Sequence, residues 1–384
     1  MKILLVSRSI LPYAGGSSVI VENLASNFGR GELVVVGGVP YFQKREKQRP
    51  SDFPEFIYLP IEISFFGRGY HYFKWTQKWQ FKPLIKKIKS IAQEHQVDYI
   101  LGVFPTDFFC HAACRAAQEL NLPFSSYFHN TYIENVNITD PKAPEIQAEI
   151  FEYSEHIFVM SKGMQRFYEE KYQLEKFVPL VHTFNEYPSN YHSPDAVTPQ
   201  KSIYQLVAIG NFNESNLDAT RRLINALKDH PKYELSLYTH VPKILLQQRG
   251  IDTSAIHHCG FVRPEEVHDI LQQYDICILT HGFKGGYGEV EYKTIFPTRT
   301  LPFLLSGKPI FAHSPKGSFL NDFIIENECA ALVDEANEQA IIKGLDRITN
   351  DSIYQKQLLK NAQQTAKQFY GKEVVKQLKN RLKQ

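Results

Sequence analysis

The chain has 384 residues, more than a single hydrophobic core comfortably serves, so its length predicts two domains. A hydrophobic fraction of 43% and a charged fraction of 22% are typical of a soluble globular protein, and no run of about 18 apolar residues could cross a membrane. The 43 basic and 41 acidic residues give a net charge of +2. Without a long basic block, this balance gives no reason to expect nucleic-acid binding.

The cysteines and the N-terminus narrow the cellular context. The five cysteines are scattered and form no C-x-x-C pair, so the sequence indicates neither a zinc site nor a disulfide framework. The apolar residues at the start of the chain give way to Ser7-Arg8-Ser9 too soon for a signal peptide and fit a first strand better. We therefore expect a cytoplasmic protein.

The first half of the chain alternates apolar runs typical of buried strands with helical periodicity, which predicts a parallel sheet covered by helices. The expected strands are residues 3–7, 32–36, 57–59, 99–103, 125–128 and 156–160. The expected helices are residues 18–28, 82–95, 108–120 and 162–172.

The same alternation starts again after a polar, proline-rich stretch at residues 186–201, which we expect to be a linker. The expected strands are residues 204–209, 235–239, 257–260, 276–280, 309–312 and 331–333. The expected helices are residues 218–228, 264–273, 298–306 and 338–348, and the last ~30 residues have the pattern of one continuous helix. The pattern predicts two doubly wound domains, residues 1–185 and 202–360, followed by a C-terminal helix at 361–384.

Two strand-to-helix junctions carry glycines. The first is Tyr13-Ala14-Gly15-Gly16-Ser17, and the second is Gly285-Gly286-Tyr287-Gly288-Glu289, which leads to Thr298-Arg299. Backbone N–H groups at the start of a helix can hold an anion, and ligands of doubly wound sheets bind beyond the carboxyl ends of the strands. We expect a phosphate-bearing small molecule in a cleft between the two domains. A tight turn is the structural alternative for Gly15-Gly16, and the missing G-x-G-x-x-G argues against a dehydrogenase.

These motifs together resemble those of family 4-type glycosyltransferases, which have the GT-B fold. The segments that carry the resemblance are Lys2-Ile3-Leu4 with Pro12 and Gly15-Gly16, Val159-Met160-Ser161-Lys162, Ala208-Ile209-Gly210-Asn211, His258-Cys259-Gly260-Phe261-Val262, Phe296-Pro297-Thr298-Arg299 and Ser306-Gly307-Lys308-Pro309-Ile310. They span nearly the whole chain in the family's order. The resemblance implies two Rossmann-like domains facing across a cleft, with residues 361–384 packing back on the N-terminal domain.

The resemblance also implies a retaining hexosyltransferase that serves polysaccharide or glycoconjugate synthesis. A sugar would pass from a nucleotide-diphosphate donor to a hydroxyl of a glycan, lipid-linked or small-molecule acceptor, without a metal or other cofactor. The implied donor-binding residues are Gly15, Gly16, Ser17, Gly210, Asn211, Thr298 and Arg299. His129 would position or polarise the sugar, and Glu289 or Glu291 would contact it. The structural alternatives are a buried histidine, exposed acids in a loop, and a capped helix start at Thr298 with a surface arginine.

Two departures from the family pattern leave alternatives open. Relatives often carry a ribose-binding glutamate where this chain has Pro302, and they direct an arginine and a lysine to the diphosphate from a segment that here, at residues 210–216, contains neither. A catalytically silent transferase-like subunit that binds a sugar or a partner enzyme is therefore one alternative. A nucleotide-sugar epimerase on the same fold is another.

A segment rich in aromatic and basic residues contains Trp75 and Trp79 and continues into Lys82, Lys86, Lys87 and Lys89. It could form an acceptor-side surface for a saccharide or a lipid-linked molecule, and with it a peripheral contact at the inner face of a membrane. The alternative is a helix that packs its aromatic residues on the sheet and turns its lysines to water.

Overall fold

The computed structural model describes residues 1–12, 16–40, 46–62, 68–104, 107–187, 199–284 and 288–383. Contacts between Cα atoms divide the chain into two compact units: an N-terminal unit of residues 1–185 with 370–384, and a C-terminal unit of residues 186–369. This division assigns residues 361–369 to the C-terminal unit. Of the predicted linker, residues 188–198 lie outside the described residues.

The N-terminal unit is built on a seven-stranded parallel sheet with the order β3-β2-β1-β4-β5-β6-β7. Its strands are β1 (Ile3–Ser7), β2 (Leu33–Pro40), β3 (Glu55–Glu62), β4 (Tyr99–Phe104), β5 (Phe124–Phe128), β6 (Ile157–Val159) and β7 (Phe177–Pro179). β1 lies between β2 and β4, so Ile3 pairs with Leu33 on one side and Tyr99 on the other. The strands β1, β4 and β5 are buried throughout because helices cover both faces of the sheet.

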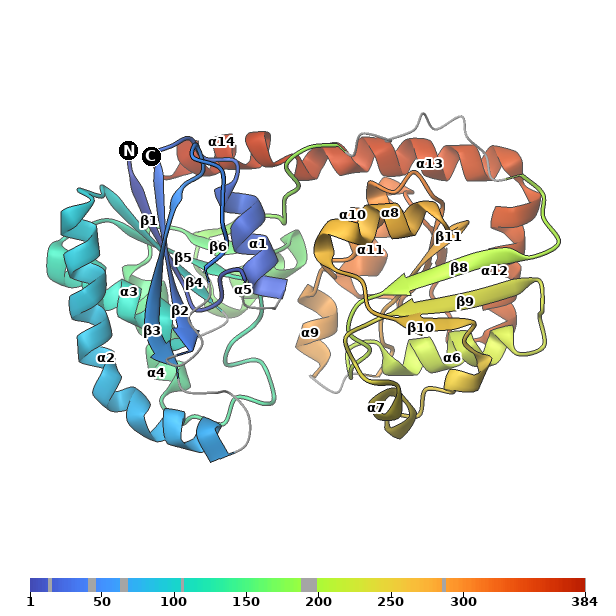
Figure 1. Ribbon diagram of the computed structural model, residues 1–384, viewed down its shortest axis with the longest axis horizontal. Helices are drawn as coiled ribbons and strands as arrows, with labels where there is room; N and C mark the ends of the chain where they lie inside the picture. Colours follow the sequence, from blue (N-terminus) through green and yellow to red (C-terminus); the bar gives the residue numbers. More distant parts are fainter. Residues whose placement is uncertain are drawn as a thin grey trace. The chain divides into compact units, whose positions relative to one another are not determined.

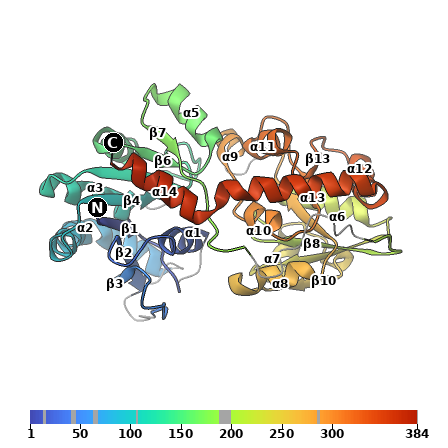
Figure 2. The ribbon, with the colours of Figure 1, turned by 90° about the horizontal axis from the view of Figure 1, so that it is seen from above.

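Helices cover both faces of this sheet (Figure 1). They are α1 (Gly16–Ala25), α2 (Arg68–Glu94), α3 (Asp107–Leu120), α4 (Ala143–Tyr153), α5 (Lys162–Tyr172) and α14 (Gly371–Arg381). α2, α3 and α4 contact one another in sequence, and α14 lies beside α1 (Figures 1 and 2). Val374, Val375 and Leu378 of α14 belong to the same buried cluster as β1 and α1.

The C-terminal unit repeats this plan with six parallel strands in the order β10-β9-β8-β11-β12-β13. Its strands are β8 (Tyr204–Ile209), β9 (Tyr233–Tyr238), β10 (His258–Gly260), β11 (Ile276–Thr280), β12 (Ile310–His313) and β13 (Ala331–Val333). Two doubly wound parallel sheets confirm the fold class predicted from the sequence.

The helices of the C-terminal unit are α6 (Leu217–Leu227), α7 (Lys243–Gln248), α8 (Val267–Gln272), α9 (Glu289–Thr294), α10 (Thr300–Leu304), α11 (Phe319–Asn327), α12 (Glu338–Asn350) and α13 (Ser352–Ala366), with short 3₁₀ turns η1 (Thr253–Ala255), η2 (Pro264–Glu266) and η3 (Lys367–Phe369). α6 and α12 pack against each other, while α10 contacts α8 and α13. None of the helices in the described ranges is long and apolar enough to cross a bilayer.

The predicted continuous C-terminal helix is wrong, because the chain breaks between α13 and α14. Tyr370 is extended and forms an isolated parallel bridge with Phe184, and the amide of Gly371 donates to the carbonyl of Phe184 at 2.8 Å. A Cβ at Gly371 would overlap the amide of Asn27, which is held by the carbonyl of Asn23 and by Asn185, each at 2.7 Å. Tertiary contact, which no helical periodicity reveals, ends the first helix here.

We expect Gly371→Ala to lower the free energy of unfolding by about 1–3 kcal/mol, because its methyl group must displace the hydrogen-bonded Asn27 amide. Gly16→Ala is the matched control: Gly16 is also the first residue of a helix, and a Cβ there meets nothing within 4 Å. Urea unfolding followed by tryptophan fluorescence measures both variants, since Trp75 and Trp79 lie in the same unit as Gly371. Equal stabilities of the two variants would contradict the steric account.

Candidate functional site

Each sheet reverses its strand order at one point, between β1 and β4 in the N-terminal unit and between β8 and β11 in the C-terminal unit. The loops that leave two such neighbouring strands diverge, and they open a crevice beyond the carboxyl ends of the strands. In the C-terminal unit, Gly210 follows β8 directly and His281 follows β11 directly. The candidate site of this unit therefore surrounds these two residues.

The guanidinium of Arg299 lies at this point of the C-terminal unit. Its Nη2 donates to the carbonyl of Thr280, the last residue of β11, at 2.6 Å. A Cβ built at Gly210 would lie 3.3 Å from Nη1 of Arg299, and Gly210 has a φ of +126°, so both space and backbone favour glycine there. Burial lowers the pKa of Arg299 to about 10, which leaves it a cation at neutral pH. Among the described residues no carboxylate pairs with it, so its charge is available to an anion.

Three buried polar atoms near Arg299 have no hydrogen-bond partner among the described residues: Nε2 of His281, Oη of Tyr292 and Oδ1 of Asp218. The rings of His281 and Tyr292 are 5.4 Å apart. Burial and then the charge of Arg299 lower the pKa of His281 to about 3, so this ring is neutral. Buried polar groups are normally paired, and a ligand with several hydroxyl groups could satisfy all three.

These three residues were not predicted from the sequence as site residues. The one signal available was position: His281 comes directly after a predicted strand, and Asp218 lies in the first turn of a predicted helix. Tyr292 had no such signal, because residues 289–294 were not predicted to be helical.

The two predicted acids, Glu289 and Glu291, have different surroundings on α9. Glu289 is exposed and pairs with Lys293 at 2.8 Å, and this ion pair lowers the pKa of its carboxyl. Glu291 is half-buried, and burial raises the pKa of its carboxyl to about 7. Of the two, Glu291 has the environment of a group that exchanges a proton near neutral pH.

A polar network supports the loop that follows β11. The amide of Phe283 donates to Oδ2 of Asp218 at 2.9 Å, and Gly282 is so close that a Cβ there would lie 2.8 Å from Oδ1 of Asp218. Arg222 stacks on the Phe283 ring at 4.8 Å and donates from Nη1 to Nε2 of His313 at 2.9 Å. The other nitrogen of His313 donates to the carbonyl of Val333, so this histidine has a fixed neutral form. The predicted glycines 285 and 286 and Tyr287 lie outside the described residues.

The other predicted donor residues of this unit lie around the same point. Asn211 is exposed, and its carbonyl accepts from the buried Asn216 side chain at 2.9 Å, which fixes the loop after β8. Thr298 is also exposed and lies in a turn, because α10 begins at Thr300 and not at residue 298 as predicted.

In the N-terminal unit, His129 directly follows β5 and is buried. Its ring packs on Tyr127 with centroids 4.2 Å apart, and neither nitrogen has a hydrogen-bond partner among the described residues. Burial, with a smaller effect of the nearby His182, holds its pKa well below the usual value. His129 is therefore a neutral imidazole with both nitrogens available to a ligand.

The remaining predicted residues of this unit are less informative. Gly16 and Ser17 begin α1, whereas Gly15 lies outside the described residues, as does the side chain of Trp75. Trp79 is exposed on α2.

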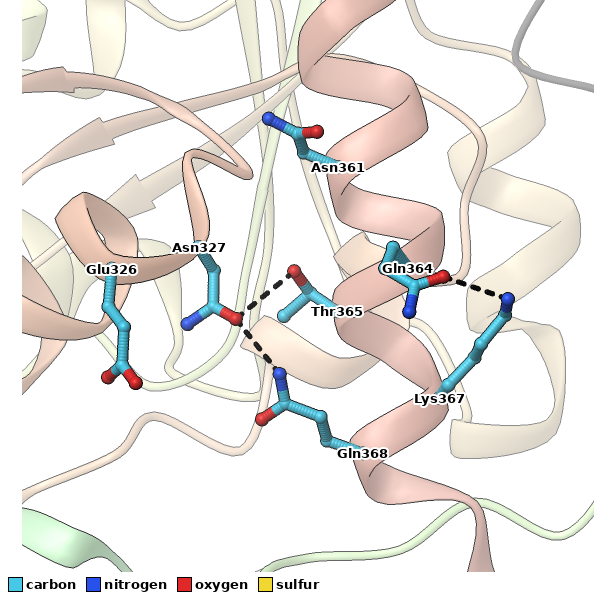
Figure 3. A pocket seen from close by; sticks show the side chains of 7 residues that line it. All are labelled: Glu326, Asn327, Asn361, Gln364, Thr365, Lys367 and Gln368. Atoms are coloured by element: carbon cyan, nitrogen blue, oxygen red, sulfur yellow. Dashed lines mark hydrogen bonds between the residues drawn. The ribbon is translucent and has the colours of Figure 1, made fainter.

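A polar cavity of about 450 Å³ lies between α11 and α13 (Figure 3). Its lining residues are Glu326, Asn327, Asn361, Gln364, Thr365, Lys367 and Gln368. Its side chains mostly bond to one another: Oδ1 of Asn327 accepts from Nε2 of Gln368 at 2.9 Å, and Lys367 donates to Gln364 at 2.8 Å. None of these residues follows the carboxyl end of a strand, so we do not place the functional site here. Within the described ranges no three His, Cys, Asp or Glu side chains group to hold a metal ion.

Comparison with solved structures shows the same fold in several proteins. Sucrose-phosphate synthase from Thermosynechococcus elongatus is 14% identical with a TM-score of 0.67, and the match covers 99% of this chain and 97% of that one. HepE from Anabaena, in complex with UDP and glucose, is 15% identical with a TM-score of 0.68 over 100% and 99% of the two chains. The lipopolysaccharide outer core galactosyltransferase WaaB is 12% identical with a TM-score of 0.63 over 100% and 99%.

These matches confirm the predicted resemblance to GT-B glycosyltransferases at the level of the fold. A Listeria monocytogenes protein assigned as a UDP-N-acetylglucosamine 2-epimerase also shares the fold, at 12% identity and a TM-score of 0.59 over 98% and 94% of the chains. No family model matches the sequence. No curated protein matches it either.

The environment of Glu291 predicts a pH-dependent stability. Its pKa is higher in the folded chain than its ordinary 4.5, so the unfolded chain releases this proton first, and the free energy of unfolding falls as pH rises from about 4.5 to about 7. Glu291→Gln removes this penalty. We expect it to stabilise the protein at pH 8 by on the order of 1–2 kcal/mol and much less at pH 5.

Thermal unfolding at the two pH values measures this difference. Glu289→Gln is the control: it removes an exposed carboxyl whose pKa is lowered and should give no gain at pH 8. A Glu291→Gln effect that is the same at pH 5 and pH 8 would mean that the carboxyl titrates normally.

Proposed function

We propose that this protein is a glycosyltransferase that moves a sugar from a nucleotide-diphosphate donor to a hydroxyl of a glycan, lipid-linked or small-molecule acceptor, with retention at the anomeric carbon. The observation that carries the proposal is the guanidinium of Arg299, which has no carboxylate partner among the described residues and lies where strand order reverses in the C-terminal unit. The shared fold with HepE, which was solved with UDP and glucose, supports the same class of ligand.

Arg299 would bind the diphosphate. Negative charge gathers on this leaving group as the bond to the sugar breaks, and a preorganised cation in a partly buried site stabilises that charge. Residues 210–216 supply neither arginine nor lysine, so Arg299 would take over the task that relatives give to cations in this segment. A planar guanidinium can bind two phosphate oxygens at once.

The unpartnered polar atoms around Arg299 would bind the sugar or ribose hydroxyls. Oδ1 of Asp218 accepts hydrogen bonds, and the neutral ring of His281 offers Nε2. Glu291, with a pKa of about 7, is partly protonated at neutral pH and could donate to a hydroxyl or a phosphate oxygen. Each contact would give a hydrogen-bond partner to a buried polar group, and burial without such a partner costs free energy.

His129 would bind the transferred sugar or the acceptor from the N-terminal unit. As a neutral imidazole it offers one donor and one acceptor nitrogen, and neither is occupied by the described residues. Its role would be to orient a hydroxyl and not to supply a positive charge.

A catalytically silent, transferase-like subunit is the second candidate, favoured by Pro302 at the position where relatives carry a ribose-binding carboxylate. It predicts nucleotide-sugar binding without turnover, or no binding. The epimerase alternative shares the fold with the Listeria protein. It predicts interconversion of the nucleotide sugar without any acceptor.

A thermal-shift panel tests donor binding. Nucleoside diphosphates of the five common bases and their sugar conjugates are added with and without magnesium, and we expect one base to raise the melting temperature in both conditions. Arg299→Met should weaken binding of that diphosphate roughly 10- to 100-fold and leave the corresponding nucleoside unaffected. Arg299→Lys is the control that keeps the charge and should bind at an intermediate level.

If no nucleotide raises the melting temperature at millimolar concentration, the donor assignment is wrong and the silent subunit is favoured. If Arg299→Met weakens binding of the nucleoside and of the nucleoside diphosphate equally, the arginine stabilises the structure of the site and does not bind the phosphates.

His129→Ala should lower kcat about 100-fold while the thermal shift with the nucleoside diphosphate stays unchanged. Release of nucleoside diphosphate from the donor in the presence of acceptor measures turnover. His129→Gln, which keeps a donor and an acceptor, should retain part of the activity. Full activity of His129→Ala would remove this residue from the site.

A further inference from the structure

α2 carries a one-sided charge. Between residues 68 and 93 the sequence has no aspartate or glutamate and seven basic residues: Arg68, Lys74, Lys78, Lys82, Lys86, Lys87 and Lys89. In a chain with a net charge of only +2, this helix therefore concentrates positive charge at one place on the N-terminal unit. α2 runs along the flank of that unit, with α3 packed against it (Figures 1 and 2).

One face of α2 is buried and the other is in solvent. Leu84, Ile85, Ile88 and Ile91 are buried on the inner side of the helix. The opposite side, called here the basic face, consists of Lys78, Trp79, Lys82, Pro83, Lys86 and Lys87, all of them exposed. The indole of Trp79 is 68% exposed, so the alternative in which α2 packs its aromatic residues on the unit fails for this tryptophan.

The described residues give the lysines of the basic face no acidic partner. Lys89, at the side of the helix, pairs with Glu119 of α3 at 2.7 Å. Lys78 lies 5.9 Å from the Trp79 ring centroid. Lys82, Lys86 and Lys87 form no ion pair with any residue in the described ranges. The charge of the face is therefore not neutralised by the part of the chain that the structure describes.

We propose that the basic face of α2 binds the surface of a bilayer that contains anionic lipids, with Trp79 inserted at the level of the headgroups. Tryptophan favours the membrane interface, where its ring is partly desolvated and its N–H stays hydrated. Lysines on the polar side of a surface helix are attracted by anionic headgroups, each by about fivefold in binding. The basic face of α2 offers both attractions, lysines for anionic headgroups and one exposed tryptophan for the interface, while the apolar side of the helix stays packed on the protein.

A bilayer fits this face better than a nucleic acid or an acidic protein. The exposed cations follow one helix over about three turns and surround a single large apolar side chain, which suits a flat surface with an apolar layer beneath it. The inference stands on α2 alone and does not depend on the proposed transfer reaction.

The chain's own fluorescence tests the proposal. Both tryptophans, Trp75 and Trp79, lie in α2, so emission from the full chain reports on this helix alone. We expect a blue shift and co-sedimentation with vesicles of 70% phosphatidylcholine and 30% phosphatidylglycerol. Vesicles of phosphatidylcholine alone should bind far less, and 0.5 M NaCl should weaken binding to the anionic vesicles by screening.

Matched variants separate the basic face from general positive charge. Lys82→Gln, Lys86→Gln and Lys87→Gln together should weaken anionic-vesicle binding roughly 100-fold. Trp79→Ala should weaken it roughly tenfold. The control combines Lys343→Gln, Lys356→Gln and Lys360→Gln, three exposed lysines of α12 and α13, and should bind like the unmodified chain.

Equal losses in the two triple variants would overturn the assignment to α2, and so would an unchanged tryptophan emission in the presence of anionic vesicles. Binding to heparin or double-stranded DNA without vesicle binding would also overturn it in favour of a soluble polyanion. Because every site in the test is exposed, circular dichroism should show that the variants fold normally.

Discussion

The constraint on which the structure depends is that a parallel strand can be joined to its neighbour only by a crossover that packs on a face of the sheet. Both units obey it, and their central strands are therefore buried on both sides. Within each unit the crossovers occupy the faces, while polar side chains of the loops gather at the carboxyl edge. Gly210, Thr280, His281 and His313 all stand at this edge of the C-terminal unit, although they are far apart in sequence.

The second organising feature is the partly buried cation at that edge. A guanidinium removed from water needs acceptors, and among the described residues Arg299 has one, the carbonyl of Thr280. Its charge also acts on its neighbours: it adds to the burial that keeps His281 neutral. Glu291 is shifted toward neutral pH by burial, so the region combines a permanent cation, a neutral imidazole and a carboxyl that titrates near pH 7. Such a combination suits a ligand with an anionic part and a hydroxylated part.

The two units have the same architecture but different side chains at the corresponding edge of the sheet. At the corresponding edge of the N-terminal unit, His129 is buried against Tyr127 and kept neutral, with no cation comparable to Arg299 in direct contact among the described residues. The lysines of the basic face lie elsewhere in this unit, on the flank that α2 forms. The carboxyl edge of the sheet and the outer face of α2 therefore carry different side chains: a neutral histidine at the strand ends and exposed lysines on the helix.

Local pattern determined most of the fold. The strands at residues 3–7, 204–209 and 276–280 agree with the observed β1, β8 and β11 to the residue, because buried strands of parallel sheets are short apolar runs bounded by polar residues. Short elements escaped this reasoning. β7 has only three residues and α9 has six, too few for a periodicity to be recognised.

For the candidate site, the sequence by itself determined the residue types at strand ends and at the glycine-bearing junctions, and through its family resemblance it indicated Gly210, Arg299, His129 and Glu291. It could not separate Glu291 from Glu289, because burial of one carboxyl and pairing of the other depend on what surrounds α9. It also missed Asp218, His281 and Tyr292, which come from three elements and meet only when the sheet is assembled. Tertiary structure decided these points, as it decided the break at Tyr370 and the exposure of Trp79, because burial and unsatisfied hydrogen bonds belong to the packed chain and not to any local run of residues.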